Sequence, residues 1–492
     1  MTGDDLGPRH PSGDDAVARL RRRLKQLCDD ADRLTANASR ATTSGVRMSL
    51  TEPLRLAVVG RVKAGKSTLI NALIGRRVAP TDEAECTRIV THYRHGSPER
   101  GELHLLSGEV VPLRLVHGRL PDELGRPVDE VSHAVVHLPE RALEGFTLID
   151  TPGLSTTTAE NERATRRAIL GEGGSVHADA LIYVFSDVQF ADDVRFLAEF
   201  AAVSGKASSS TAASIGVLSH ADTFGSGAWG PTDPVADATE FAAGLARQRA
   251  AELGEVLAVA GNLGEAGAAG LVTEQNARDL AAFASATDDD LRYPLPADDA
   301  GITALRERVG DYGLRFGRER ARQGAGALSR WLIDVSGADA LFHALEHRYV
   351  RREAQLKARQ ALDELRDAPV GAAERLDLLR LIDGARSDAE LHLLNELEAW
   401  EALVARHPGH PLVGELERMM EARDDAALVG VAPGSAPADV RGAALALASQ
   451  AQREAALTGD SLIVSVQRVR SRSFTLVLER LEAAGTSVPR MT

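Results

Sequence analysis

The sequence predicts an α/β domain with a mostly parallel sheet and helices on both faces, followed by an elongated all-helical bundle. Short apolar runs alternate with helical patterns between residues 51 and 296, and from residue 297 onward the patterns are almost entirely helical. Strands that alternate with helices form parallel sheets covered on both faces. A chain of 492 residues is also longer than one hydrophobic core usually organises.

Four regions are expected along the chain. These are a disordered leader at 1–13, an N-terminal helix at 14–50, the α/β domain at 51–296 and the helical bundle at 297–492. In the N-terminal helix, apolar residues recur every three or four positions from Val17 onward, as in the seam of a coiled coil. We favour a helix docked on the next domain over a self-associating coiled coil.

Composition limits the classes of function. The formal net charge of −14 argues against nucleic acid as a partner, because broad nucleic-acid binding needs a basic surface. The two cysteines, Cys28 and Cys86, are too few for a disulfide framework and fit a reducing cytoplasm. No run of about 18 apolar residues occurs, so we expect any action on membranes to be exerted from their surface.

The α/β domain contains a series of strand-like apolar runs. They are "LRLAVVG" (54–60), "FTLIDTPG" (146–153), "ALIYVFS" (180–186), "ASIGVLSHAD" (213–222) and "GEVLAVAG" (254–261). The interval 96–145 is expected to form an antiparallel insertion at the edge of the sheet. Beyond the linker at 293–301, helical stripes are interrupted near 368–372, 406–411 and 430–439, which predicts several packed helices.

A phosphate-binding loop follows the first strand. "GRVKAGKS" has the form G-x-x-x-x-G-K-[ST], in which backbone N–H groups at the start of a helix hold phosphate. Lys66 is expected to reach the β- and γ-phosphates, and Ser67 to bind Mg²⁺. The nucleotide-binding residues predicted here are Gly60, Arg61, Val62, Lys63, Ala64, Gly65, Lys66, Ser67 and Thr68.

Two further segments complete the predicted phosphate and metal site. In "TDEAECTRIVTHYR", Thr87 is the preferred metal-binding threonine and Thr81 its rival. In "DTPG", Asp150 is expected to hold Mg²⁺ through water, and the Gly153 N–H to contact the γ-phosphate. The metal ligands are thus Ser67, Thr87 and Asp150. The spacing and the D-x-x-G form indicate a GTPase.

The residue after this motif is a leucine, Leu154, where Ras-like GTPases keep a glutamine that orients water. A leucine cannot orient water. The catalytic group must therefore come from another part of the protein.

Base recognition departs from the usual [NT]-K-x-D pattern. In "VLSHAD", Asp222 is in place to accept hydrogen bonds from guanine, Ser219 stands for Thr or Asn, and His220 replaces the lysine. His220 could stack on the purine or could face solvent without a role. Gly261, in "AVAGN", is a further base-contacting residue. The departure leaves the choice between GTP and ATP open.

Together, "GRVKAGKSTLINALIG", "ECTRIVTHYR", "LIDTPGL", "VLSHAD" and "LVTEQNARDLAAFA" resemble the bacterial dynamin-like proteins of the dynamin superfamily. The segment "SGADALFHALEHRYVRREAQLKARQAL" is similar to the actinobacterial isoniazid-inducible members. The resemblance implies a GTPase head on a helical stalk. It also implies a neck made from the N-terminal helix, the helix at 301–325 and the C-terminal helix.

The resemblance has implications for partners and catalysis. It implies hydrolysis stimulated by a head-to-head homodimer, hetero-assembly with a related dynamin-like protein, and lipid binding at the far end of the stalk, for which 406–413 and 426–440 are the candidate segments. At the position of Lys63, dynamins carry a small polar residue and guanylate-binding relatives carry an arginine finger. Lys63 is therefore either an internal cationic finger or a solvent-facing charge that only attracts nucleotide.

The expected function is hydrolysis of GTP to GDP and phosphate with Mg²⁺, coupled to membrane remodelling from the cytoplasm at the inner face of the cell membrane. Lys63, Lys66, Ser67 and Thr87 are the predicted catalytic residues. The alternative is a GTP-dependent switch or scaffold that binds a protein partner through its helical half without remodelling membrane. An ATPase relative is a third hypothesis.

Overall fold

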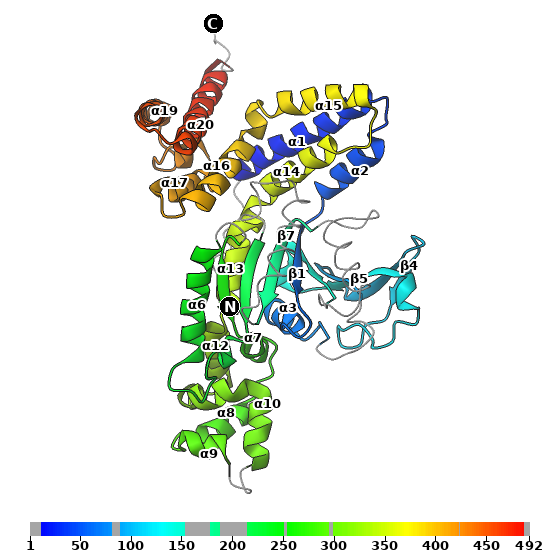
Figure 1. The fold of residues 1–492 in the computed structure, drawn as a ribbon, viewed down its shortest axis with the longest axis vertical. Helices are drawn as coiled ribbons and strands as arrows, with labels where there is room; N and C mark the ends of the chain where they lie inside the picture. The colour runs from blue at the N-terminus through cyan, green and yellow to red at the C-terminus, as the bar shows by residue number, and fades with distance from the viewer. Residues whose placement is uncertain are drawn as a thin grey trace. The chain divides into compact units, whose positions relative to one another are not determined.

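The computed structural model describes residues 11–80, 89–152, 178–186, 214–249, 253–294, 299–422 and 424–486. They divide into two compact units (Figure 1). The described residues between 53 and 350 form an α/β unit, and residues 11–52 with 351–486 form a helical unit. The chain therefore starts in the helical unit, builds the α/β unit, and then returns.

The α/β unit is organised by a sheet with strand order β4-β3-β5-β2-β6-β1-β7-β8-β9 among the described residues. Its strands are β1 (Leu54–Gly60), β2 (Thr91–His95), β3 (Arg100–Leu105), β4 (Val110–Leu113), β5 (Val131–Leu138), β6 (Phe146–Asp150), β7 (Ala180–Phe185), β8 (Ser214–Ser219) and β9 (Val256–Val259). β1 pairs in parallel with β6 and β7, and β8 pairs in parallel with β7 and β9. The predicted mostly parallel sheet is confirmed.

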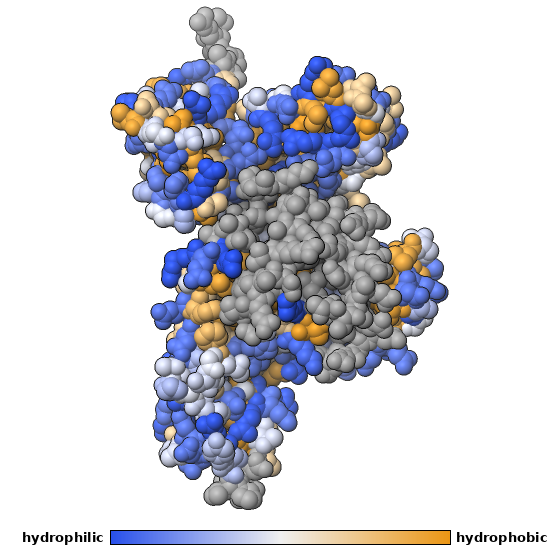
Figure 2. Space-filling model, viewed as in Figure 1, coloured by the Kyte–Doolittle hydropathy of each residue, from blue (hydrophilic) through white to orange (hydrophobic). Residues whose placement is uncertain are grey.

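The interval 96–145 contains antiparallel strand pairs, and β2 also pairs antiparallel with β6 next to it. β3 pairs antiparallel with β4 and β5, whereas β5 itself runs parallel to β2. Figure 2 shows hydrophobic residues at the hairpin of β3 and β4, where Leu106, Val110 and Val116 are exposed. Pro112 lies in the edge strand β4, and a proline there withholds one N–H from pairing with another chain.

Helices complete the α/β unit well beyond the predicted boundary at 296/297. They are α3 (Lys66–Ile74), α6 (Pro234–Gln248), α7 (Gly261–Ala268), α8 (Glu274–Ala282), α9 (Asp288–Arg292), α10 (Asp299–Phe316), α11 (Arg318–Ala321), α12 (Ala325–Ser336) and α13 (Ala338–Arg348). Ile302 and Val309 of α10 and Leu332 of α12 belong to the same buried cluster as Val59 of β1 and Tyr183 of β7. The division between compact units therefore falls at 350/351.

Two helices, one long and one short, come first in the helical unit. The predicted single helix at 14–50 is α1 (Pro11–Leu34) followed by α2 (Arg40–Ser49). The break occurs at Ala36 and Asn37, which both have positive φ and so cannot continue a right-handed helix. α1 begins inside the predicted leader, of which residues 1–10 lie outside the described residues.

The other helices of this unit are α14 (Glu353–Arg366), α15 (Ala372–Ala385), α16 (His392–Arg406), α17 (Pro411–Met420), α18 (Asp425–Leu428), α19 (Pro437–Leu457) and α20 (Ser461–Thr486), with short 3-10 turns η5 (Val350–Arg352) and η6 (Ala389–Leu391). The apolar seam of α1, including Leu20, Leu24 and Leu27, is buried with Leu362 of α14 and Ile382 of α15. The seam thus docks within its own chain, on helices of the helical unit.

The three segments expected to form one neck lie in both units. α1 packs on α14 and α15 and α20 packs on α19 and α16 in the helical unit, whereas α10 packs on α7 and α8 in the α/β unit. The neck therefore stays a prediction. Among the described helices, none combines the length and apolar character needed to cross a membrane.

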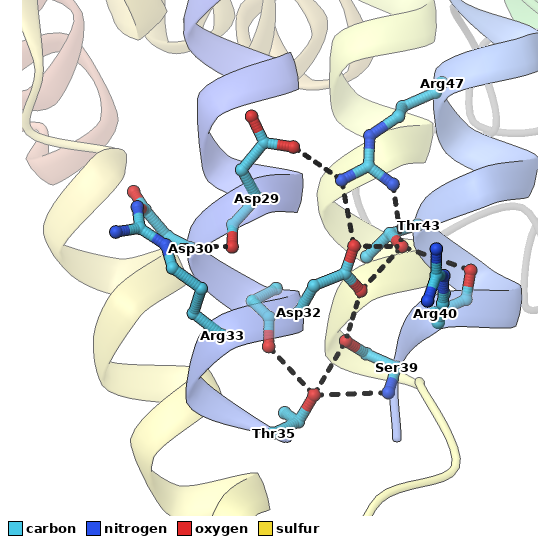
Figure 3. A network of polar contacts seen from close by, with 10 residues as sticks. Asp29, Asp30, Asp32, Arg33, Thr35, Ser39, Arg40, Thr43 and Arg47 are labelled. Carbon is cyan, nitrogen blue, oxygen red and sulfur yellow. Dashed lines mark hydrogen bonds and ion pairs between the residues drawn. The ribbon is translucent and has the colours of Figure 1, made fainter. Parts of the chain in front are cut away.

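A buried polar network fixes the turn between α1 and α2 (Figure 3). The Asp32 carboxylate accepts hydrogen bonds from Thr43 Oγ1 at 2.8 Å, Ser39 Oγ at 3.2 Å and Arg47 Nη2 at 2.9 Å. Burial acts to raise the pKa of Asp32, but the bonds from Arg47, Thr43 and Ser39 outweigh it and lower the pKa. The network holds the two helices in one antiparallel arrangement.

Candidate nucleotide-binding site

The predicted phosphate loop lies between β1 and α3. β1 ends at Gly60, and a Cβ added there would lie 2.1 Å from the Val184 carbonyl oxygen of β7. Only glycine fits this close approach. α3 begins at Lys66 directly after Gly65, which has φ +87. The loop therefore turns into a helix N-terminus, where backbone N–H groups and the helix dipole favour phosphate.

Lys66 is held inside this loop. Its side chain is buried, and Nζ donates hydrogen bonds to the carbonyl oxygens of Gly60 at 3.1 Å and Arg61 at 2.9 Å. Burial lowers the pKa of the Lys66 ammonium, and Asp150 opposes that shift. The ammonium is thus held between the carbonyl oxygens of the phosphate loop.

Asp150 and Ser67 meet beside Lys66. Burial raises the pKa of Asp150 to about 6, although Lys66, a hydrogen bond from the Ser67 hydroxyl and the Thr151 N–H all lower it. Thr151 Oγ1 donates to the Val58 carbonyl oxygen at 2.8 Å and so fixes the end of β6 against β1. A hydroxyl and a carboxylate are oxygen ligands of the kind Mg²⁺ prefers, so the donor set fits this ion.

Lys63 differs from Lys66 in both exposure and backbone. Its side chain is exposed, and its φ is +64. A non-glycine residue held in this left-handed region costs about 1 kcal/mol or more. The loop therefore keeps a cationic side chain on its outer surface at the expense of local strain.

On the base side, Ser219 has a structural contact. Its Oγ donates to the Phe185 carbonyl oxygen at 3.0 Å, which ties the end of β8 to β7. His220 has φ +56, and its Nε2 lies 3.4 Å from the Cβ position built on Gly65. The structure thus places the imidazole against the phosphate loop.

Asp222 has one oxygen occupied and one without a hydrogen-bond partner. It lies in η4 (Ala221–Thr223), and Oδ2 accepts from Asn262 Nδ2 at 2.9 Å. Oδ1 is buried without a hydrogen-bond partner in the described part of the chain. Guanine offers an N1–H and a 2-amino group that could satisfy such an oxygen.

Asn262 and Gly310 were missed by the sequence prediction. Asn262 follows the predicted Gly261 directly, and Gly261 lies against Thr68, with a built Cβ 3.4 Å from Thr68 Cγ2. α10 bends at Gly310, with φ 67 and ψ 175, and a Cβ there would lie 3.3 Å from Asn262 Nδ2. That backbone conformation is nearly exclusive to glycine, and it brings α10 past the Asp222 carboxylate without a side chain.

These groups gather at the carboxyl ends of β1, β6 and β8, where open α/β sheets bind ligands. The structure brings together the phosphate loop, Asp150, Ser219, His220, Asp222 and Gly261. Thr87, its rival Thr81, Gly153 and Leu154 lie outside the described residues. The fold and this site define the chain as a P-loop nucleotide-binding protein.

Comparisons with known proteins narrow the class. The model of the Dynamin family matches residues 56–220. The isoniazid-induced protein IniC of Mycobacterium tuberculosis is 32% identical over 348 residues, which span 64% of this chain and 67% of that protein. A bacterial dynamin-like protein of Nostoc punctiforme is 34% identical over 123 residues, or 22% of this chain and 18% of that one.

Among solved structures, an oligomerised bacterial dynamin pair linked to the long range sensing and tethering of membranes matches at 12% identity and a TM-score of 0.32, over 98% of this chain and 76% of that one. The chain belongs to the dynamin family and is a GTPase. The resemblance inferred from its motifs is confirmed.

Proposed function

We propose that the chain hydrolyses GTP to GDP and phosphate with Mg²⁺, and that turnover is coupled to head-to-head dimerisation and to membrane binding and remodelling at the cytoplasmic surface. Membership of the dynamin family supports this proposal. Hetero-assembly with a related dynamin-like protein is part of it. The lipid contacts are assigned to 406–413 and 426–440, which include the connections on either side of α17 and α18.

The observation that carries the choice of GTP is the buried Asp222 Oδ1. A guanine base can donate to it, whereas adenine has an acceptor at N1 and no 2-amino group. Leaving a buried acceptor unpaired costs about 1–3 kcal/mol, which corresponds to a preference of roughly ten- to a hundredfold. Asn262 keeps the other oxygen occupied and so fixes the direction of the free one.

The phosphate loop and the residues beside it are assigned to the phosphates and to Mg²⁺. The backbone N–H groups of residues 60–68 hold the phosphates, and Lys66 exchanges its bonds to Gly60 and Arg61 for phosphate oxygens. Ser67 and Asp150, the latter through water, hold Mg²⁺ together with Thr87, and Gly153 contacts the γ-phosphate. The ion supplies positive charge that offsets the phosphate charge.

Leu154 stands where Ras-like GTPases keep a catalytic glutamine, and we propose that Lys63 supplies a catalytic cation instead. Its exposure and strained backbone are compatible with a side chain that turns toward the nucleotide when two heads meet. The charge that develops on the transferred phosphoryl group is stabilised by such a cation. His220, packed against Gly65, is assigned to positioning of the phosphate loop.

One experiment tests the proposal as a whole. Phosphate release is measured with GTP and with ATP, in the presence and absence of anionic liposomes, with Lys66→Ala as the inactive control. We expect turnover of GTP over ATP, stimulation by liposomes and co-sedimentation with them. GTP turnover that liposomes leave unchanged, without co-sedimentation, would instead support the alternative of a GTP-dependent scaffold for a protein partner. Equal turnover of ATP would contradict the assignment of Asp222.

A further inference from the structure

The helical unit contains a cavity of about 510 Å³ bounded by α1, η6, α16, α17, α18 and α20. In Figure 1, α16, α17 and α20 lie together within this unit. The volume lies within the range of about 300–1,000 Å³ typical of small-molecule sites. Its apolar wall is formed by Leu393, Met419, Met420, Leu428 and Leu476.

A chain of hydrogen bonds ends on a carboxylate in this cavity. His392 Nε2 lies 2.9 Å from Ser473 Oγ, and Ser473 Oγ donates to Glu396 Oε1 at 2.6 Å. Glu396 is 3% exposed, and its Oε2 has no hydrogen-bond partner in the described part of the chain. The donors orient the carboxylate but leave one oxygen unused, and burying such a group without a partner is costly.

Glu396 is unusual among the buried carboxylates of the described residues, which are Asp179, Asp222, Glu265, Glu396 and Glu401. Asp179, Glu265 and Glu401 each form an ion pair with an arginine. Asp222 and Glu396 have no ion pair with a lysine or arginine. Asp222 is assigned to the base of the nucleotide, and the same reasoning leaves Glu396 in need of a donor.

The charges around the cavity favour a cation. Five described lining residues are acidic (Glu390, Glu396, Asp424, Asp425 and Glu479), and two are basic (Arg19 and Arg480), a formal balance of −3. Arg480 is itself engaged with Asp425, to which its Nε donates at 3.1 Å. A cationic group that enters is therefore attracted by the surrounding field and meets apolar surface behind it.

We propose that this cavity binds a cationic amphiphile, in which a primary ammonium group pairs with Glu396 Oε2 and an alkyl or aromatic body packs against the methionine and leucine wall. An ammonium is compact and carries three donors, which suits the unpaired oxygen of a buried carboxylate that lines the cavity.

The test uses the chain of 492 residues and n-octylammonium as the probe, with n-octanol and octanoate as neutral and anionic matches. Binding is measured by titration calorimetry. We expect saturable binding of octylammonium at one site per chain, about ten- to a hundredfold tighter than octanol, because a charge-assisted hydrogen bond adds that much. Octanoate should bind more weakly than octanol.

Three variants locate the site. Glu396→Gln should reduce octylammonium affinity about ten- to a hundredfold and leave octanol affinity unchanged. Ala422→Trp, which places bulk at a lining position, should weaken both probes. Glu398→Gln is the matched control on the same helix, since Glu398 pairs with Arg386 and does not line the cavity. Denaturant unfolding followed by circular dichroism reports whether the helical unit of Glu396→Gln folds, and we expect GTP turnover in solution to be unchanged.

The proposal is overturned if octylammonium shows no saturable binding to the unsubstituted protein, or binds no better than octanol. It is also overturned if a folded Glu396→Gln variant binds octylammonium as tightly as the unsubstituted protein does. Should Glu396→Gln fail to fold, unchanged octylammonium binding by Ala422→Trp has the same consequence.

Discussion

Among the described residues, each of the two units buries one carboxylate that has no ion pair with a lysine or arginine, and the surroundings of the two differ. In the α/β unit, Asp222 lies in a short turn after β8, with Asn262 on one oxygen. In the helical unit, Glu396 lies in the middle of α16 beside a cavity, with Ser473 on one oxygen. The first is a sequence motif at a strand end, and the second is assembled from helices far apart in the chain. If both proposals hold, an unpaired buried carboxylate identifies a ligand site with or without a sequence motif.

The largest expected effect is the loss of GTP turnover when Lys63, the exposed lysine of the phosphate loop, is replaced. Lys63→Ala should lower GTP turnover about a thousandfold or more, in the range of cationic fingers, with little change in nucleotide affinity. Single-turnover hydrolysis and equilibrium binding of GTP measure the two quantities. Lys63→Arg, which keeps the cation, should retain most of the turnover. Equal losses in turnover and affinity would assign Lys63 to binding only.

The next effect tests a buried carboxylate that does have a basic partner. Arg359 Nη1 donates to Glu401 Oε1 at 2.5 Å, and both side chains are buried. Glu401→Ala leaves the guanidinium unpaired, so the free energy of unfolding of the helical unit should fall by about 3–5 kcal/mol. Denaturant unfolding followed by circular dichroism measures it.

A double variant, Arg359→Met with Glu401→Leu, is the control for the buried pair. It should recover most of the loss, because apolar replacement of a whole buried pair is often neutral. Glu398→Ala, which removes the partner of the half-buried Arg386, is the comparison. If Glu401→Ala lowers the free energy of unfolding no more than Glu398→Ala does, the buried pair with Arg359 is not the stabilising contrast to Glu396 that we expect.

Asp222→Asn replaces the carboxylate with an amide, whose NH2 group can take the place of the free oxygen. The amide can donate to the 2-oxygen of xanthine, so we expect the preference for GTP over xanthosine triphosphate to shift by about ten- to a hundredfold toward the latter. Competition binding with the two nucleotides measures the shift. An unchanged ratio would mean that Asp222 does not contact the base.

The smallest effect concerns the network of Figure 3. Asp32→Asn removes the charge that faces Arg47 and should lower the free energy of unfolding by about 1 kcal/mol. Because folding lowers the pKa of Asp32, this stabilisation is present above the ordinary aspartate pKa of about 4 and is lost as the pH falls through the folded-state value. The unfolding curves of the two proteins should therefore converge in acid. Asp29→Asn, at a more exposed partner of Arg47, should cost less.

The sequence was informative where function depends on neighbouring residues in one segment. The phosphate loop, Asp150 and Asp222 each follow a strand, so the end of an apolar run located them and the sheet brought them together. Asn262 could have been found in the same way, because it directly follows a predicted base-contacting residue. The break between α1 and α2 also had a signal in Asn37, since asparagine tolerates the left-handed region.

Other features had no such signal. Amphipathic helices α10 to α12 carry the same pattern whether they join the sheet or the helical unit, so the boundary at 350/351 depends on packing that periodicity does not encode. Glu396 and Ser473 occupy ordinary positions in two helices, and their 2.6 Å contact exists only once α16 and α20 pack. The neck was inferred from a resemblance and joins segments of both units, so it stays a prediction.

The order in which the chain builds its two units has a consequence for synthesis in the cell. α1 and α2 are made before the α/β unit, but α14 and α15, which cover the leucine seam of α1, are made only after the whole α/β unit. Domains generally fold from the N-terminus as they emerge, and exposed apolar surface favours aggregation meanwhile. The helical unit therefore matures only after the α/β unit has been translated, and a ribosome that stalls within that unit releases a chain with an uncovered hydrophobic helix.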